Sequence, residues 1–280
     1  MEPTNTRSLI NTFITSLEGA GKSRHTIIAY KKDMEQFVGH LASVEKNDIR
    51  EVKKEDIEAF IAKLLHDGYT KKSASRKLNS IRTFFRFLKT ESLLQVNPSL
   101  EVSHPKYTQA PPRILSKLEY RALRDVAKED PRTYAIVEIL LQTGLRIGEL
   151  ARIKLDDVVN DSLRVGGRDI PLNQAVSKAI SDYIKARYDS NDPHLFVTKS
   201  GKPLLVRNIR SIIARCFREV GIENAKVQDL RNTFIAYQLM NGASISYISK
   251  IVGHKRLSST EKYLELIKEQ GTSREKLGEL

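Results

Sequence analysis

The sequence has little of what secreted, membrane-spanning and zinc-binding proteins depend on. Its single cysteine, Cys216, excludes an intramolecular disulfide and a cysteine cluster for zinc. No apolar run approaches the roughly 20 residues that a bilayer-spanning helix needs. The first residues, Met-Glu-Pro-Thr-Asn, lack the basic and then apolar layout of a signal peptide. We therefore expect a cytoplasmic protein with no membrane partner.

Acidic residues are too few to balance the basic ones. The chain has 47 Lys and Arg against 34 Asp and Glu, a net charge of +13, and a pI of about 9.7. Hydrophobic residues make up 40% of the chain, as in ordinary folded proteins. A positive surplus of this size favours a polyanionic partner, and nucleic acid is the commonest one. Charge alone is equally compatible with a generically basic protein, so local patterns must decide.

Prolines divide the chain into two parts. At 280 residues it exceeds the roughly 100–200 residues of a typical domain, which favours two domains. Proline removes a backbone donor and disfavours helix in the preceding residue, so a proline-punctuated polar stretch predicts an extended linker. Such pairs are Asn97-Pro98, His104-Pro105 and Pro111-Pro112. We predict a helical N-terminal domain over residues 1–103, a linker over 104–113 and a second domain over 114–280.

The first domain shows helical periodicity, with Ser23 as the cap of one helix and a second helix over 56–65. A third helix, over about 71–89, is the most informative because it has no acidic residue. Like charges repel at helical spacing, and phosphates would neutralise that repulsion. The pattern therefore predicts DNA contact, with a merely solvated face as the alternative. Its seven basic residues are Lys71, Lys72, Arg76, Lys77, Arg82, Arg86 and Lys89.

The second domain is predicted to be mainly α-helical with one small β-sheet. Ser116 and Glu119 have the spacing of a capping box, and Gly144 follows an apolar helical segment over 136–141. Alternating apolar residues around Gly166-Gly167 indicate a β-hairpin over 163–172. Further helices are expected from Leu145 and at about 173–188, 205–220, 229–241, 246–251 and 258–267.

Four local signals in the second domain need a joint explanation. They are Thr143-Gly-Leu-Arg-Ile-Gly-Glu-Leu150, Asp229-Leu-Arg-Asn-Thr-Phe234, Val252-Gly-His-Lys255 and a tyrosine, Tyr263, nine residues after His254. Each alone has an ordinary explanation. An arginine near a helix start is usually in a surface ion pair, a histidine after glycine is usually part of a helix end, and a helix tyrosine usually lies in the core.

In this order, the four signals resemble the boxes of the tyrosine recombinase (phage integrase) family, and specifically its Xer-like two-domain members. The N-terminal half resembles the helical core-binding (SAM-like) domain of those members, through Leu78–Leu88 and Asn97-Pro98. The resemblance implies that Tyr263 is the nucleophile and that Arg146 and Arg231 clamp the attacked phosphate. It also implies that His254 donates a further hydrogen bond and that Glu149 orients a neighbouring active-site group.

The chemistry explains why these residue types belong together. A tyrosine hydroxyl has a pKa near 10 and is a weak nucleophile unless a neighbour takes its proton. Guanidinium groups stay charged and contact phosphate oxygens in pairs, so they can stabilise the charge of a phosphorane. By resemblance, the product is a 3′-phosphotyrosine with a free 5′ hydroxyl. Because the bond energy is kept in that linkage, neither ATP, metal nor cofactor is expected.

The sequence departs from the family pattern at three places. Gln228 stands where the family usually has a histidine, and it cannot take up a proton at neutral pH, which leaves His254 or water as the base. Asn232 replaces another frequent histidine, at a position that matters less to the pattern. The hairpin tip has no lysine to protonate the leaving 5′ oxygen. Arg168, with Arg164 behind it, is the nearest replacement, and a lysine from elsewhere such as Lys154 is the alternative.

The resemblance also implies partners and competing functions. It predicts double-stranded DNA with paired inverted half-sites, a dimer on each site, a homotetramer on two sites and strand exchange through a Holliday junction. The segment 265–280 would dock on a neighbouring subunit, or else form a frayed tail. The role would be resolution of plasmid, transposon-cointegrate or chromosome dimers in a nucleoid-associated protein of a prokaryote or mobile element. The alternatives are a DNA-binding protein that has lost catalysis and a monomeric type IB topoisomerase.

Overall fold

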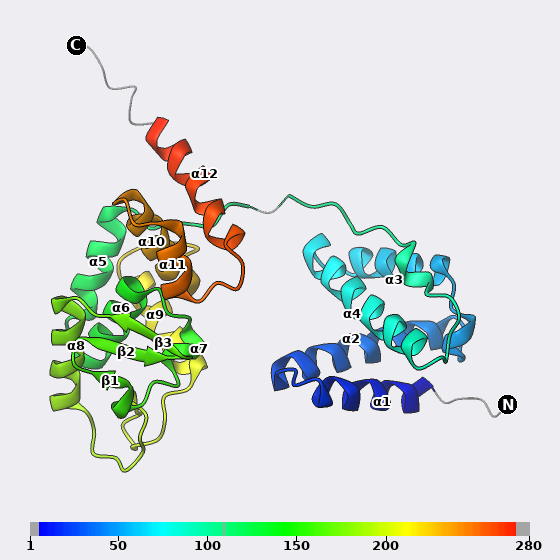
Figure 1. Cartoon of the computed structure of the whole chain (residues 1–280), viewed down its shortest axis with the longest axis horizontal. Helices are drawn as coiled ribbons and strands as arrows, with labels where there is room; N and C mark the ends of the chain where they lie inside the picture. The colour runs from blue at the N-terminus through cyan, green and yellow to red at the C-terminus, as the bar shows by residue number, and fades with distance from the viewer. Residues whose placement is uncertain (1–5, 109, 273–280) are drawn as a thin grey trace. The chain divides into compact units, whose positions relative to one another are not determined.

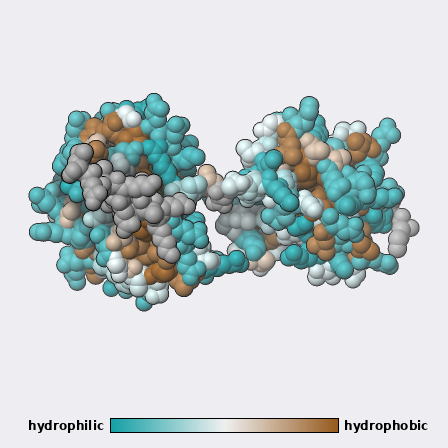
Figure 2. Space-filling view, turned by 90° about the horizontal axis from the view of Figure 1, so that it is seen from above, coloured by the Kyte–Doolittle hydropathy of each residue, from teal (hydrophilic) through white to brown (hydrophobic). Residues whose placement is uncertain are grey.

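The computed structural model describes residues 6–108 and 110–272, and it divides into two compact units, Met1–Gln109 and Ala110–Leu280. Each unit has its own hydrophobic core. Helices dominate, and one small sheet lies in the second unit, so the predicted fold class is confirmed (Figure 1). On the face seen in Figure 2, hydrophilic residues cover most of each unit and apolar ones show between them. Over the described residues, no helix combines the length and apolarity needed to cross a membrane.

The described residues of the first unit form a bundle of four α-helices around a phenylalanine-rich core. Ser23 caps the second helix as predicted, because its hydroxyl accepts the backbone N–H of Thr26 at 3.2 Å. The first helix lies outside the predicted set. Phe13, which that helix contributes, contacts Phe84 with ring centroids 5.2 Å apart. The elements are α1 Thr6–Gly19, α2 Arg24–Ser43, η1 Ile49–Glu51, α3 Lys54–His66, α4 Lys71–Thr90 and η2 Pro98–Leu100.

The basic helix α4 is neutralised partly from within the protein. Asp33 of α2 is only 2% exposed and accepts hydrogen bonds from Lys77 at 2.9 Å and from Arg76 at 2.6 and 2.8 Å. Burial alone would raise the pKa of Asp33, but hydrogen bonds from Arg76, Ser80 and Lys77 outweigh it and lower that pKa. Lys77 is itself 7% exposed. The DNA contact predicted for Lys77 stays a prediction, and in this structure its ammonium is buried against the Asp33 carboxylate.

The Arg82 side chain also makes hydrogen bonds within the first unit. Its guanidinium donates to the carbonyl oxygens of Ser99 at 3.1 Å and Val102 at 2.6 Å, and lies 2.7 Å from Nε2 of His104. These contacts fasten the chain after η2 to α4, so the Arg82 guanidinium is bonded within the first unit, and its predicted DNA contact stays a prediction. Five of the seven basic residues remain exposed, namely Lys71, Lys72, Arg76, Arg86 and Lys89.

The buried Asp33 cluster makes a stability prediction. Asp33→Asn removes the carboxylate charge and leaves the Lys77 ammonium buried without a counter-charge, which is expected to cost about 3 kcal/mol. Hydrogen exchange followed by mass spectrometry should show faster exchange over α2 and α4. Glu35→Gln, on the exposed side of α2, serves as the matched control. Unchanged exchange in α4 of the Asp33 variant would show that the cluster is energetically unimportant.

The second unit packs nine helical elements and a three-stranded sheet around the apolar helix α6, counted over the residues that the structure describes. Helices α5, α8 and α10 all pack against α6. Helix α6 ends at the predicted turn, because Gly144 directly after it takes a left-handed conformation with φ 64°. The elements are α5 Lys117–Ala127, α6 Pro131–Thr143, α7 Ile147–Leu150, η3 Leu155–Asp157, β1 Val158–Val159, β2 Ser162–Val165, β3 Arg168–Pro171, α8 Gln174–Ala186, α9 Val206–Glu219, α10 Val227–Met240, α11 Ile245–Val252 and α12 Ser258–Thr272.

The sheet is antiparallel in the order β1-β2-β3. Val165 pairs with Arg168, so Gly166 and Gly167 form the predicted two-residue turn, with φ of 56° and 72°. Strand β1 lies outside the predicted set because two residues carry no readable alternation. The helix expected from Leu145 is the single turn α7, which starts two residues later.

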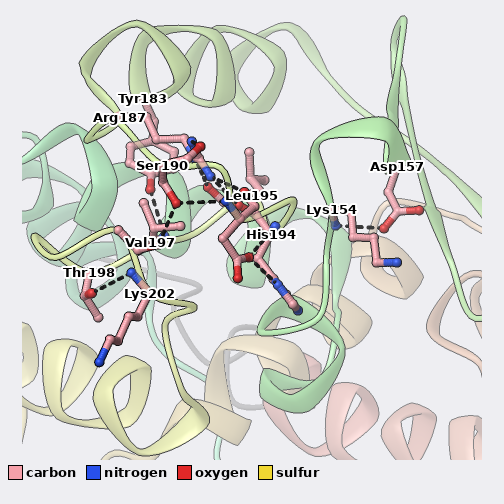
Figure 3. A network of polar contacts seen from close by, with 12 residues as sticks. Lys154, Asp157, Tyr183, Arg187, Ser190, His194, Leu195, Val197, Thr198 and Lys202 are labelled. Atoms are coloured by element: carbon pink, nitrogen blue, oxygen red, sulfur yellow. Dashed lines mark hydrogen bonds and ion pairs between the residues drawn. The ribbon is translucent and has the colours of Figure 1, made fainter.

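Several hydrogen bonds from one arginine side chain hold the irregular segment between α8 and α9 (Figure 3). Arg187 donates to the carbonyl oxygens of Asp192 at 2.8 Å, His194 at 2.9 Å and Leu195 at 3.1 Å. Lys154, in the same view, places its backbone N–H 2.8 Å from a carboxylate oxygen of Asp157. One arginine thus satisfies backbone oxygens that no helix or strand would satisfy.

Candidate active site

The C-terminal end of α11 is the centre of the site. Gly253 ends this helix in a left-handed conformation with φ 67°, which leaves the last carbonyl oxygens free of helical partners. Three guanidinium groups use those oxygens, and they come from α10, from the residue before α7 and from β3. Arg231 donates to Val252 at 2.8 Å, Arg146 to Gly253 at 3.1 Å and Arg168 to Ile251 at 2.6 Å. The negative end of a helix is a favourable place for such a cluster of cations.

Arg231 is the buried member of the cluster, with 2% of its surface exposed. It also donates to the carbonyl oxygen of Gly144 at 2.5 Å, which ties α10 to the turn after α6. Burial, followed by the charge of Arg146, lowers the pKa of Arg231 to about 10. The guanidinium therefore stays protonated at neutral pH. Gly144 must be glycine here, because a Cβ on it would overlap the ring of Phe234.

Arg146 is the exposed member, and Glu149 holds it. A Glu149 carboxylate oxygen accepts the Arg146 backbone N–H at 2.7 Å, and the other lies 3.3 Å from an Arg146 guanidinium nitrogen. That second oxygen also accepts from the Arg168 guanidinium. Glu149 therefore bridges two arginines, as a residue that orients its neighbours would. The Arg146 side chain is 45% exposed, so a phosphate can reach it.

Arg168 is held by two acceptors. Its side chain is only 15% exposed and donates to Glu149 and to the carbonyl oxygen of Ile251. Arg164, by contrast, lies 3.7 Å from Asp169 with an exposed side chain. The hairpin thus brings Arg168 to the predicted site, but as a paired group rather than a free proton donor.

His254 follows Gly253 directly and contacts α12. Its Nδ1 lies 2.8 Å from the hydroxyl of Thr260, a residue that is fully buried and lies outside the predicted site. Burial, followed by the charges of Arg231, Arg146 and Lys262, lowers the pKa of His254 to about 4. The imidazole is therefore neutral at neutral pH and acts as a hydrogen-bonding group.

An NMR titration of the DNA-free protein checks this assignment. The imidazole signal of His254, identified by its loss in His254→Gln, should stay neutral until the pH falls to about 4. Arg146→Gln removes one of the cations that lower this pKa and should raise it. Titration of His254 near its ordinary pKa of about 6.5 would contradict the electrostatic picture of the cluster.

Tyr263, on α12, is 3% exposed and points into the protein. Its hydroxyl donates to the Oδ1 of Asn232 at 2.8 Å. Burial raises the pKa of Tyr263, and the nearby charge of Arg231 offsets part of that rise. The ammonium of Lys262 lies 5.4 Å from the ring centroid. The hydroxyl is therefore protonated and covered in this conformation.

Gln228 is linked to Tyr263 through Asn232. Its Nε2 donates a long hydrogen bond to the Oδ1 of Asn232, at 3.4 Å. It lines a hollow of about 460 Å³ together with residues that include Leu145 and Phe217. Asn232, at the position that matters less to the family pattern, makes the direct contact with the hydroxyl.

No group of three His, Cys, Asp or Glu side chains that could hold a metal ion occurs within the described ranges 6–108 and 110–272. The cations of the site are its arginines and Lys262. Such a cluster can bind a tetrahedral anion through paired hydrogen bonds.

Comparison with known proteins gives matches over nearly the whole chain. Residues 113–270 match the model of the phage integrase family, and residues 10–92 match that of the phage integrase N-terminal SAM-like domain. The tyrosine recombinase XerC of Thermodesulfovibrio yellowstonii is 30% identical over 281 residues, which covers 93% of this chain and 92% of the relative.

Solved structures give the same picture. The crystal structure of XerA recombinase is similar with a TM-score of 0.55 and 26% identity, over 98% of this chain and 100% of that one. A lambda integrase tetramer bound to a Holliday junction is similar in fold, with a TM-score of 0.77 and 18% identity, over 94% of this chain and 77% of that one.

Proposed function

The chain belongs to the phage integrase family, and from this premise we propose that it is a site-specific DNA recombinase whose nucleophile is Tyr263. One observation carries the proposal. Arg146, Arg231, His254 and Tyr263 are spread over more than a hundred positions of the sequence, yet all lie around the end of α11. Cations, a neutral imidazole and a phenol in one place are the groups that attack on a phosphodiester requires.

The reaction is a transesterification. The Tyr263 oxygen attacks phosphorus, the bond from phosphorus to the 5′ oxygen breaks, and a 3′-phosphotyrosine with a free 5′ hydroxyl results. The phenol proton leaves to His254 or water, and the 5′ oxygen takes a proton from water. One phosphoester replaces another, so the reverse reaction rejoins DNA without ATP or metal.

Arg146 and Arg231 have different roles in binding the phosphate. Both share the carbonyl oxygen of Val252, at 3.4 and 2.8 Å, so they are neighbours whose free N–H groups can face one anion. The exposed Arg146 captures the phosphate, and the buried Arg231 gives the less screened charge. Arg168 acts through Glu149, which it helps to hold against Arg146, and it is a positioning residue in this scheme.

Attack requires that Tyr263 leave its buried position. Helix α12 packs against α10 and α11 and carries the tyrosine, so movement of α12 would expose the hydroxyl (Figure 1). A neighbouring subunit in a tetramer on two inverted-repeat sites would stabilise the moved helix. The docking segment begins on α12 at Glu265, and its part after residue 272 lies outside the described residues.

DNA binding by the first unit would use the exposed face of α4. Five cations of this helix are exposed. Among them, Arg76 shares the buried Asp33 carboxylate with Lys77, but its side chain is still 53% exposed. Phosphate contacts of this kind position the protein on the duplex without reading its sequence. Binding through them should weaken steeply with salt.

A suicide-substrate assay tests the proposal. DNA recovered with the protein would supply the site, and a nick near the cleavage position would let the free 5′ end diffuse away and trap the covalent adduct. We expect an adduct with the wild-type chain and no relaxation of plasmids that lack the site. Specific binding without any adduct would support a DNA-binding protein that has lost catalysis. Relaxation of site-free plasmids would support a type IB topoisomerase.

A further inference from the structure

Asn232 has a fixed orientation in the site. Its Nδ2 donates to the Oδ1 of Asp229 at 3.2 Å, and its Oδ1 accepts from the hydroxyl of Tyr263 at 2.8 Å. Asp229 is itself held, since its other oxygen accepts the backbone N–H of Lys226 at 2.8 Å. Asp229, Asn232 and Tyr263 are 7%, 6% and 3% exposed. An ionised carboxylate only accepts hydrogen bonds, so it must face the amide nitrogen, and the amide oxygen must then face the tyrosine.

This orientation selects one protonation state of the tyrosine. An amide oxygen accepts hydrogen bonds and cannot donate them, so the phenol must keep its proton to make the contact. A phenolate in the same place would face the lone pairs of the amide oxygen. A hydrogen bond that serves only the neutral form disfavours ionisation, and burial acts in the same direction.

We propose that Asn232 is a positioning residue that holds Tyr263 protonated and withdrawn, and that breaking their hydrogen bond precedes attack on DNA. This inference rests on the proposed function of Tyr263. Gln228 is a second donor to the same acceptor, because its Nε2 lies 3.4 Å from the Oδ1 of Asn232. When Tyr263 leaves, the Gln228 amide can donate to the vacated oxygen, so the buried acceptor is not left without a partner. Gln228 thus assists release of the nucleophile rather than catalysing proton transfer.

The test uses Asn232→Leu, which keeps the approximate shape of the side chain and removes the acceptor. Single-turnover adduct formation on the suicide substrate should be about three- to tenfold faster at neutral pH, the factor that corresponds to one ordinary hydrogen bond. The rise of the rate with pH should move to lower pH. Gln238→Leu, on the same helix, is the matched control and should leave both unchanged. Asn232→His, which restores an acceptor, should return the profile toward that of the wild type.

A second measurement needs neither DNA nor activity. With 3-fluorotyrosine placed at position 263 of the full chain, a ¹⁹F NMR titration reports the ionisation of that phenol alone. Asn232→Leu should lower its apparent pKa relative to the wild type, and Asn232→Ala gives the same comparison if the leucine variant does not fold. An unchanged titration, whether cleavage is altered or not, would overturn the proposal and leave Asn232 with a structural role. Absence of any wild-type adduct would instead count against the proposed function.

Discussion

Replacing Tyr263 with phenylalanine is expected to abolish covalent attachment to DNA completely. The ring and its packing are retained, and only the hydroxyl that forms the phosphoester is lost. The lost hydrogen bond to Asn232 should reduce stability by about 1 kcal/mol, too little to unfold the unit. Denaturing gel electrophoresis of the suicide-substrate reaction measures the adduct, and a gel-shift assay checks that binding persists.

Two exposed tyrosines of the same unit provide matched controls. Tyr237 and Tyr247 are 52% and 50% exposed, so both are accessible without any rearrangement. Tyr237→Phe and Tyr247→Phe should form the adduct at the wild-type rate. An adduct that persists in Tyr263→Phe would show that another residue attacks the phosphate.

Replacing Arg231 with alanine is expected to slow adduct formation by about a thousandfold, the effect typical of removing one preorganised group that stabilises transition-state charge. Its charge lies in a buried place, where water screens it least. Arg231→Lys keeps a charge but loses the fork that contacts two oxygens, so it should recover only part of the rate. Single-turnover kinetics with saturating protein separate this effect from weaker binding.

Arg231 also has a structural role, and the experiment must separate its effect on stability from its effect on cleavage. Its loss leaves the carbonyl oxygens of Gly144 and Val252 without this donor. Arg187→Ala is the matched control, because Arg187 likewise donates to several backbone oxygens but lies in the segment after α8. Both variants should lose stability, and only Arg231→Ala should lose cleavage per folded molecule. Equal losses of cleavage would mean that Arg231 merely supports the fold.

The sequence predicted the helices of the second unit well where local signals were strong. Ser116 and Glu119 form the expected capping box, and the hairpin turns at Gly166 and Gly167 as expected. Prediction failed where the signal was short or came from elsewhere in the chain. Strand β1 has two residues, and α1 is held mainly by packing of its buried apolar residues such as Phe13.

The basic helix α4 shows how a local pattern can mislead. Within the helix, the lack of acidic residues predicted that phosphates neutralise the repulsion between its cations. Asp33 lies more than forty positions away from Lys77 in the sequence, and only packing of α2 against α4 brings the two together. A charge pattern read along one helix therefore gives the sign of its partner but not whether that partner is DNA or protein.

The site was predictable as a set of residues but not as a network. The order and spacing of Arg146, Arg231, His254 and Tyr263 indicated their association. The carbonyl oxygens at the end of α11 have no sequence signature, since every residue has one. Nor does sequence alone reveal that Asn232 rather than Gln228 contacts the hydroxyl, because both lie on the same helix within one turn of Arg231.

Mapping the trapped adduct is the most direct measurement of the central claim. After cleavage of the suicide substrate, nuclease and protease digestion leave a nucleotide remnant on one peptide, which tandem mass spectrometry locates. The account predicts a remnant attached through a 3′-phosphate to Tyr263. Attachment at another residue, or a 5′-phosphate linkage, would contradict it.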